Sequence, residues 1–333
     1  MHDAARVVEW RYAARRVPMP ARPLHNVFAG PYVDRASGLR KDAAWVANAL
    51  TAPATRFVPV WRAQSLIRRR PAPAAVLLER GALPALDPAG AILLGEFNGV
   101  VTFAIELDAA AAGTDLQGGE FADLRMTGAL LPAAEAGLLA YARALVYWRE
   151  RHRHCGACGT PTAAGDAGHV MTCTNPACGA QFFPRIDPAI IVLVTDGERA
   201  LLGRQAAWPR GRYSTIAGFV EPGESFEDAV VREVREETSI EVGRLAYHSS
   251  QPWPFPSSLM VGFVAQAAST AISCPDGELE DARWFSPADI AGGTPLLPPP
   301  QSISFRLIDD WYAGLTGRRL ADEPGAALWN QQR

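Results

Sequence analysis

One stretch of twenty residues, from Gly218 to Glu237, constrains the fold of this 333-residue chain more than any other. It reads GFVEPGESFEDAVVREVREE, a glycine-containing turn followed by a helix with many glutamates. At 3.6 residues per turn, the carboxylates of Glu233, Glu236 and Glu237 project from one side of that helix. Like charges at this spacing destabilise an isolated helix, so the pattern favours a cation bound between them. Hard divalent ions such as Mg²⁺ or Mn²⁺ take oxygen ligands of this kind and bridge to substrate phosphates.

The start of this helix is well specified. Ser225, followed three residues later by Asp228, fits a capping box, and alanine and valine residues supply an apolar face away from the acids. The alternative interpretation is a solvated surface helix, on which glutamate and arginine alternate for solubility. The helix residues alone leave both interpretations open.

The segment resembles the Nudix box of diphosphate hydrolases, G-x5-E-x7-R-E-U-x-E-E-x-G-U, in which U is aliphatic. The matching residues are Gly218, Glu224, Arg232, Glu233, Val234, Glu236, Glu237 and Ile240. Ser239 stands where the family has its second glycine, which would end the helix in a left-handed conformation. This departure concerns the end of the helix and leaves the acids in place.

Composition bounds the class of protein. A chain of 333 residues with 48% hydrophobic residues is globular and exceeds one domain of about 100–200 residues, so we expect two or three units. The net charge of -3 gives no overall attraction to nucleic acid or to an anionic membrane. The apolar run Ala189–Val194 is too short to cross a bilayer, and the start MHDAARVVEW lacks the apolar stretch of a signal peptide. We therefore expect a cytoplasmic protein with no membrane partner.

Four of the five cysteines form two pairs, C-x2-C and C-x4-C, separated by fourteen residues. The pairs are Cys155 with Cys158 and Cys173 with Cys178. This spacing predicts a structural zinc ribbon, in which four thiolates close a tetrahedral shell around one Zn²⁺. Disulfides are the alternative, and the expected cytoplasmic location disfavours them.

The chain divides into four predicted segments. They are an N-terminal α+β domain over residues 1–150, the zinc ribbon over 151–184, a catalytic domain over 185–320, and a tail over 321–333. The runs AILLGEF and VVTFAIEL, separated by Asn98 and Gly99, predict a hairpin in the first domain, and AIIVLV with ALLGR predicts another in the catalytic domain. The likeness of these hairpins suggests that the N-terminal domain is a degenerate copy of the catalytic fold, without an acid-rich box. A helix is predicted over Pro132–Arg149 and another over Ser302–Leu315.

Three prolines between residues 250 and 258 stiffen the segment SQPWPFPSS and present Trp253 and Phe255. The two rings suit a wall for a flat ligand, but they could equally fill the protein core. The segment resembles the signature of NADH pyrophosphatases within the Nudix superfamily. Zinc ribbon, box and signature also occur in that family's order, over about the last 180 residues.

This resemblance implies a Nudix α/β/α sandwich with a mixed sheet. It implies an enzyme that hydrolyses NAD(H) to nicotinamide mononucleotide and AMP with two or three Mg²⁺ or Mn²⁺ ions, usually as a homodimer. Some members of the family also remove NAD caps from RNA. Metal-assisted attack of water on one phosphorus accounts for this reaction without a covalent intermediate.

The resemblance also assigns roles to individual residues. Catalysis and metal binding fall to Glu233, Glu236 and Glu237, with Glu278 and the backbone carbonyl of Ala217 as further metal ligands. Glu224 is expected to brace Arg232. The substrate-binding residues implied are Gln251, Pro252, Trp253, Pro254, Phe255, Pro256, Ser257, Ser258, Ser304, Phe183, Phe219 and Arg125.

Two other functions compete with this one. The first is a Nudix hydrolase of another nucleoside diphosphate, such as ADP-ribose or a dinucleoside polyphosphate, which would share every metal ligand. The second is a nucleic-acid-binding regulator that uses the ribbon and the basic residues 149–154, with the box as a ligand sensor. The intact acids and the acidic pI of about 6.1 weigh against the second.

Overall fold

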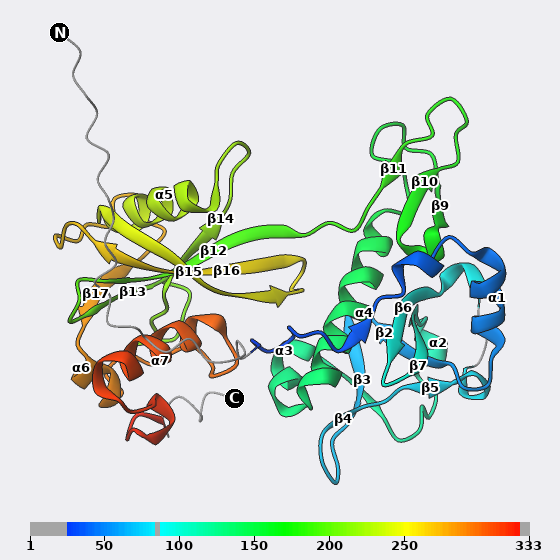
Figure 1. Ribbon diagram of the computed structural model, residues 1–333, viewed down its shortest axis with the longest axis horizontal. Coiled ribbons are helices and arrows are strands. Elements are labelled where there is room, and N and C mark those ends of the chain that lie inside the picture. Colours follow the sequence, from blue (N-terminus) through cyan, green and yellow to red (C-terminus); the bar gives the residue numbers. More distant parts are fainter. Residues whose placement is uncertain (1–24, 84–86, 327–333) are drawn as a thin grey trace.

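The computed structural model describes residues 25–83 and 87–326, which form an N-terminal α+β part, a small ribbon and a C-terminal part (Figure 1). The first ten residues, used above to judge the signal peptide, and residues 327–333 of the predicted tail lie outside the described residues. In the described ranges, no helix combines the length and the apolar character needed to cross a membrane.

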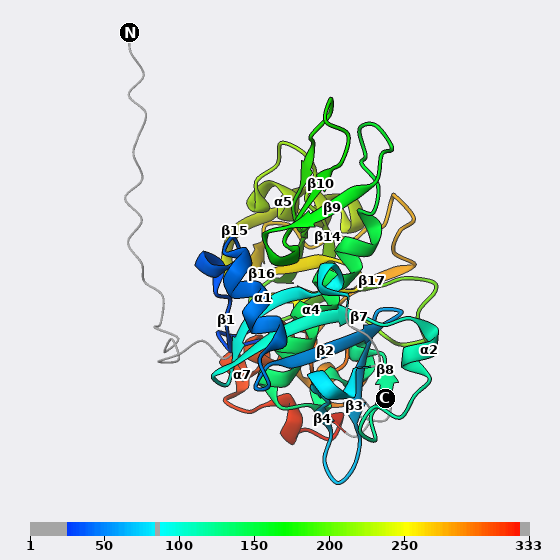
Figure 2. The same cartoon turned by 90° about the vertical axis from the view of Figure 1, so that its right-hand side faces the viewer.

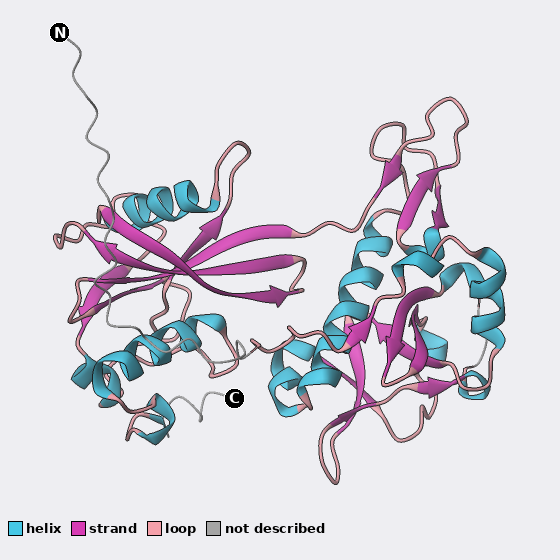
Figure 3. Ribbon diagram, viewed as in Figure 1, coloured by secondary structure: helices cyan, strands magenta, loops and turns pink. Residues whose placement is uncertain are grey.

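The N-terminal part holds a sheet covered on both faces (Figures 1 and 3). Its elements are β1 (Val33–Asp34), α1 (Ala43–Thr51), β2 (Arg56–Trp61), β3 (Gln64–Arg68), β4 (Ala74–Ala75), β5 (Leu78–Glu79), β6 (Ile92–Phe97), β7 (Val100–Glu106), α2 (Ala109–Ala112), β8 (Glu120–Ala122), α3 (Leu124–Thr127) and α4 (Ala133–Arg151). The strand order is β1-β6-β7-β2-β3-β4, with β5 on β2, β8 on β3, and β2 parallel to β7. The hairpin predicted at Asn98 and Gly99 is confirmed, because both residues take the positive φ that a tight hairpin turn needs.

Helix α4 covers one face of this sheet, as its apolar period predicted. Leu138, Leu139 and Ala142 of α4 pack with Val58 and Leu94 of the sheet. Residues of α1 pack with the opposite face. Figure 2 shows the ribbon at the top of this part, and its strands are β9 (Thr162–Gly165), β10 (Val170–Cys173) and β11 (Gln181–Phe182) in the order β11-β10-β9.

The C-terminal part is the α/β/α sandwich that the resemblance implied. Its elements are β12 (Asp187–Thr195), β13 (Ala200–Arg204), β14 (Ile216–Phe219), α5 (Phe226–Thr238), β15 (Val242–Trp253), β16 (Ser258–Ala267), β17 (Asp281–Phe285), α6 (Pro287–Ala291) and α7 (Ile303–Thr316). The sheet runs β15-β16-β12-β13-β17, with β14 on β12. It is mixed, because β12 and β16 are parallel and the other pairs are antiparallel.

Alternation along β12 sends neighbouring side chains to opposite layers. Ile190 and Val192 pack with Val230 and Val234 of α5, whereas Ile191 packs with α7. The closing helix predicted over Ser302–Leu315 is confirmed, since α7 spans Ile303–Thr316.

The N-terminal and C-terminal parts are joined by hydrogen bonds at the start of the described chain. The amide Nδ2 of Asn26 donates to the carbonyl of Ser250 at 2.8 Å, and Arg306 of α7 donates to Asn26 Oδ1 at 3.0 Å. Figure 1 shows the β15–β16 turn pointing from the sandwich toward the N-terminal part. This turn carries the proline-rich signature.

Candidate active site and zinc site

Helix α5 begins and ends as its sequence requires. Ser225 and Asp228 form the predicted capping box, in which each residue bonds the other's backbone N–H. At the other end, Ser239 takes the left-handed conformation (φ 58°) although it is not glycine, and its N–H donates to the carbonyl of Arg235 at 2.8 Å. The substitution of serine for the family's glycine therefore leaves the helix end in the usual geometry, at a cost of about 1 kcal/mol.

Arg232 organises the acids of α5. Its guanidinium donates to Glu224 at 2.5 and 2.9 Å, to Glu233 at 2.8 Å and to Glu236 at 3.1 Å. It also donates to the carbonyl of Phe219 at 2.9 Å, which ties the helix to β14. The hydrogen bond from Arg232 lowers the pKa of Glu224 to about 2. The expected brace between Glu224 and Arg232 is thus present.

The Glu233 carboxylate lies against the backbone of Gly218. A Cβ atom at position 218 would come within 2.0 Å of that carboxylate, so the glycine is required by the approach of the acid. Gly218 follows Ala217 in β14, where Ala217 pairs with Ile191 of β12. The Ala217 carbonyl and the Glu233 carboxylate therefore belong to one small region between β14 and α5.

Glu237 is the most deeply buried acid of the helix, with 3% of its surface exposed. Burial, reinforced by the charges of Glu278 and Glu233, raises the pKa of Glu237 to about 8. Burial also raises the pKa of Glu233. Carboxylates that repel one another in a desolvated site fit a hard divalent cation, which would offset both the repulsion and the burial.

An open cleft of about 900 Å³ lies between the sandwich and the N-terminal part. Its lining includes Arg69, Arg125, Trp208, Gln251, Trp253 and Ser304. Ile191, the β-sheet partner of Ala217, lies on its wall. None of the acids of α5 is among the lining residues of the cleft. Ile191 faces α7, whereas its neighbours Ile190 and Val192 face α5. The volume of the cleft is in the usual range for a small-molecule site, about 300–1,000 Å³.

The two aromatic rings of the signature both pack on the N-terminal core, and one of them also lines the cleft. Trp253 lines the cleft, whereas Phe255 packs on Phe28 of the N-terminal part with ring centroids 5.7 Å apart. The guanidinium groups of Arg125 and Arg143 lie 5.1 and 4.7 Å from the centre of the Phe255 ring. Both rings are partly buried against the N-terminal core, and the Trp253 ring centroid is 6.2 Å from that of Phe28. The core interpretation therefore fits both rings, and Trp253 in addition forms part of the cleft wall.

Two polar residues implied as substrate contacts are buried and have protein partners. The Gln251 amide donates to the carbonyls of Val27 and Gln301 at 3.2 and 2.9 Å and accepts from the N–H of Ile303 at 2.9 Å. The hydroxyl of Ser304 accepts from Thr215 at 2.8 Å. Both residues border the cleft, and in this arrangement their polar groups fix its walls.

The other signature residues lie around the turn. Pro252, Pro254, Ser257 and Ser258 line a second cavity on the far side of Trp253, and Pro256 is exposed. The Ser257 hydroxyl donates to Asp187 at 2.7 Å and ties the turn to β12. Phe183 and Phe219 are 61% and 60% exposed and lie outside both cavity linings. The implied substrate residues are therefore not all brought together around one cavity of the described chain.

Arg69 and Trp208 line the cleft, although the sequence interpretation did not name them. Arg69 also forms an ion pair with Glu120. The run of three arginines before Pro71 was the available signal for Arg69. The position of Arg69 beside the C-terminal part depends on how the two parts pack, and no local sequence pattern reveals that packing.

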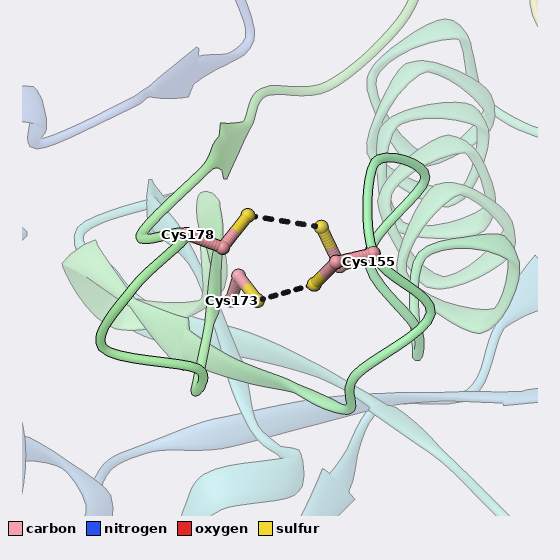
Figure 4. Close-up of side chains that lie close together, drawn as sticks. Cys155, Cys173 and Cys178 are labelled. Atoms are coloured by element: carbon pink, nitrogen blue, oxygen red, sulfur yellow. Dashed lines mark hydrogen bonds between the residues drawn. The ribbon is translucent and has the colours of Figure 1, made fainter.

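The four paired cysteines come together at one end of the ribbon, with their sulfurs turned toward one another (Figure 4). The Sγ atoms of Cys155 and Cys178 are 3.8 Å apart and those of Cys158 and Cys173 are 3.5 Å apart. Four sulfurs at about 2.3 Å from a tetrahedral Zn²⁺ would be about 3.8 Å apart, so the cluster fits zinc. Within the described ranges, no other group of three or more histidines, cysteines or acids is as tightly gathered.

Comparison with known proteins places these features in one family. The chain is 43% identical over 248 residues to the NAD-capped RNA hydrolase NudC of Stutzerimonas stutzeri, a match that covers 74% of this chain and 86% of the relative. The chain belongs to the NADH pyrophosphatase family of Nudix hydrolases. It is also 42% identical to NudC of Pseudomonas aeruginosa PAO1, over 74% of this chain and 85% of that one. Human NAD-capped RNA hydrolase NUDT12 is 38% identical over 68% of this chain and 53% of its own length.

Family profiles match all three parts of this Nudix hydrolase. A NUDIX domain matches residues 185–307, and an NADH pyrophosphatase zinc ribbon domain matches residues 150–183. A rudimentary NUDIX domain of the NADH pyrophosphatase type matches residues 54–148. The prediction that the N-terminal part is a degenerate copy of the catalytic fold is therefore confirmed.

The basic residues near the end of α4 have partners within the N-terminal part of the hydrolase. Arg149 donates to the carbonyls of Ala89 and Gly90 at 2.8 and 3.1 Å, and Arg153 pairs with Glu106 at 3.0 Å. These contacts brace the sheet against α4. They favour a structural role for this segment over the nucleic-acid contact of the competing hypothesis.

Proposed function

We propose that this protein hydrolyses the diphosphate bond of NAD(H), yielding nicotinamide mononucleotide and AMP, and that it removes NAD caps from RNA. The observation that carries the proposal is the set of acids on α5, in which Arg232 bonds Glu233 and Glu236 and in which Glu237 is buried. The names of the relatives, which are NAD-capped RNA hydrolases at 38–43% identity, support the choice of substrate.

We assign the divalent metal to Glu233 and Glu237, with Glu236, Glu278 and the carbonyl of Ala217 as further ligands. Mg²⁺ or Mn²⁺ bound there would supply positive charge to the diphosphate and activate the attacking water. The protein prepares the acids for a metal ion in two ways. Arg232 orients Glu233 through a hydrogen bond, and Glu237 is buried, so that a bound cation would offset the cost of its charge. The cluster as a whole would accept the proton of the water.

The cleft supplies the substrate contacts in this proposal. Arg125 and Arg69 offer cations for the phosphates, and Trp253 offers a flat wall for a ring. Phe183 and Phe219 have exposed rings on which a base could stack. Gln251 and Ser304 hold the wall of the cleft in place through the hydrogen bonds described above.

We also retain the remaining sequence predictions as proposals. We propose that the domains span residues 1–150, 151–184, 185–320 and 321–333. We also propose that the protein is cytoplasmic and forms a homodimer. In support of the dimer, Phe183, Ile186 and Phe219 expose about 60% of their surfaces on segments next to the start of β12. Light scattering should give twice the chain mass of 35.8 kDa.

One experiment tests the activity directly. Purified protein with Mn²⁺ is incubated in parallel with NADH, NAD⁺, ADP-ribose and NAD-capped RNA, and the products are identified by mass. Mononucleotide plus AMP from NADH supports the proposal, whereas preference for ADP-ribose would replace it with the other nucleoside diphosphate activity. Glu237→Gln should abolish turnover, and Glu241→Gln, which changes a surface acid paired with Arg235, is the matched control.

A further inference from the structure

Arg204, the last residue of β13, is a buried arginine outside the acid cluster of α5. Only 8% of its surface is exposed, and its Nε has no hydrogen-bond partner among the described residues. Buried donors are normally paired, so an unsatisfied guanidinium nitrogen costs free energy of folding. Proteins accept such a cost mainly at positions that serve a site as well as the core.

The Arg204 guanidinium holds two loops at once. One terminal nitrogen donates to the carbonyl of Trp208 at 3.1 Å, and the other forms an ion pair with the carboxylate of Glu280. The backbone adds a further bond, in which the N–H of Glu280 donates to the carbonyl of Arg204 at 2.9 Å. A single planar fork therefore joins the loop after β13 to the loop before β17.

The loop after β13 forms part of the cleft wall. Trp208 lines the cleft, and its N–H donates to the carbonyl of Gln205 at 3.0 Å in a tight turn. At the base of the loop, Gly203 and Ser214 exchange two backbone hydrogen bonds of 2.9 Å, and Ser214 also lines the cleft. The bond from Arg204 thus fixes the backbone that carries the Trp208 ring.

The loop before β17 carries Glu278, the acid that we assign to the metal from outside α5. Its neighbour Leu279 is buried in the same core cluster as Val234 of α5. After burial, the charge of Glu278 is the largest cause of the raised pKa of Glu237, so the Glu278 carboxylate acts on the acids of α5. Arg204 holds this loop at Glu280, two residues from Glu278.

We propose that Arg204 is a positioning residue that holds Glu278 against the acids of α5 and Trp208 in the wall of the cleft. This inference rests on the proposed function, since it takes Glu278 as a metal ligand. The acids of α5 do not line the cleft themselves, so Arg204 provides a direct link between the metal side and the cleft side of the site.

The first test measures the affinity for Mn²⁺ by electron paramagnetic resonance of the free ion, without turnover. Arg204→Gln should weaken binding by about 10- to 100-fold, the usual effect of removing a side chain that orients a metal ligand. A simple charge effect has the opposite sign, because removal of a cation strengthens the attraction for Mn²⁺. In a Glu278→Gln background, Arg204→Gln should have no further effect, since both changes act on one ligand.

Arg149→Gln is the matched control for the loss of an arginine that braces the fold. Arg149 is half-buried and donates to backbone carbonyls at 2.8 and 3.1 Å, as Arg204 does, but these carbonyls belong to the N-terminal part. Its replacement should leave the affinity for Mn²⁺ within about twofold of wild type.

Arg204→Lys separates the two loops and serves also if Arg204→Gln does not fold. Lysine keeps a charge for Glu280 but replaces the fork with one ammonium, so it loses the bond to the Trp208 carbonyl. At saturating Mn²⁺, KM for NADH should rise about 3- to 10-fold, as expected for one lost hydrogen bond, with kcat and Mn²⁺ affinity within about twofold of wild type. A purely structural role would instead change all three in parallel with stability.

The outcomes separate this inference from the proposed function. Binding of Mn²⁺ that depends on Arg204, without hydrolysis of NADH, would support the positioning role and refute the activity. The positioning role would be overturned by unchanged or tighter Mn²⁺ binding in Arg204→Gln, by an equal loss in the Glu278→Gln background or in Arg149→Gln, or by an unchanged KM in Arg204→Lys. Failure of the wild type to bind Mn²⁺ would overturn both.

Discussion

Replacing Gly218 with alanine should disable the acid cluster and leave the fold intact. The new methyl group would lie 2.0 Å from the Glu233 carboxylate, whereas ordinary van der Waals contact begins at 3.4 Å. The carboxylate must therefore recede by about 1.4 Å. Because it is the end of a flexible side chain, the backbone can stay in place, and the cost to folding should be that of one distorted rotamer, about 0.5–1.5 kcal/mol.

The cost to activity should be much larger. Misplacement of a reacting group by about 1 Å lowers rates by about 100-fold, which corresponds to about 2.7 kcal/mol of transition-state stabilisation. We therefore expect kcat/KM for NADH to fall at least about 100-fold in Gly218→Ala at saturating Mn²⁺. Initial rates from chromatography of the products measure the effect on activity, and urea unfolding measures the effect on folding.

Two further variants make the result decisive. Gly243→Ala is the control, because a Cβ atom at this β15 glycine meets its nearest neighbour, the carbonyl of Gln266, at an ordinary 3.5 Å. Gly218→Ala combined with Glu233→Gln should be no less active than Glu233→Gln alone, since both changes remove the same ligand. Activity within about threefold of wild type in Gly218→Ala, or additive effects in the double variant, would refute the reasoning.

Three other changes test separate features. Glu237→Gln should lower turnover by orders of magnitude without destabilising the metal-free fold, because the amide avoids burying a charge; equal rates to wild type would exclude Glu237 as a ligand. Cys155→Ser should release the single bound zinc and lower the unfolding temperature, as elemental analysis and calorimetry would show; full zinc content would contradict the ribbon site. Because the pKa of His169 falls to about 4 in the folded protein, the unfolded chain alone gains a proton between pH 6.5 and pH 4, and about 3 kcal/mol of stability should be lost as pH falls through this window. Urea unfolding at pH 7 and pH 4.5 should show this decrease in the wild type and a smaller one in His169→Gln.

Local chemistry explains which elements could be predicted from the sequence. The turn at Asn98 and Gly99 and the capping box at Ser225 and Asp228 each depend on a few adjacent residues. The four cysteines of the ribbon could be predicted for the same reason, because the short spacing within each pair keeps the two sulfurs close together. Ser239 shows the limit of such local prediction. It takes a left-handed conformation at the end of α5, although serine disfavours that conformation more than glycine does.

The cleft could not be predicted in the same way. Its walls come from residues as distant as Arg69 and Ser304, so their meeting depends on how two folded parts pack. The signature shows the difficulty within a single segment, because Trp253 lines both cavities whereas Pro252 and Pro254 line only the second. Phe255 contacts Phe28, more than 200 residues earlier in the chain, and no periodicity within the signature encodes that contact.

The position of Phe255 also explains what a degenerate domain without catalytic acids contributes. The ring packs against the N-terminal core beside Phe28, and Gln251 bonds the carbonyl of Val27, so residues on both sides of Trp253 are held by the N-terminal part. Separation of the two parts would expose the Phe255 ring and leave the buried amide of Gln251 without one acceptor, and both changes cost free energy. The wall of the cleft is therefore a shared product of the two domains. The N-terminal part therefore contributes to the cleft by holding this wall in place.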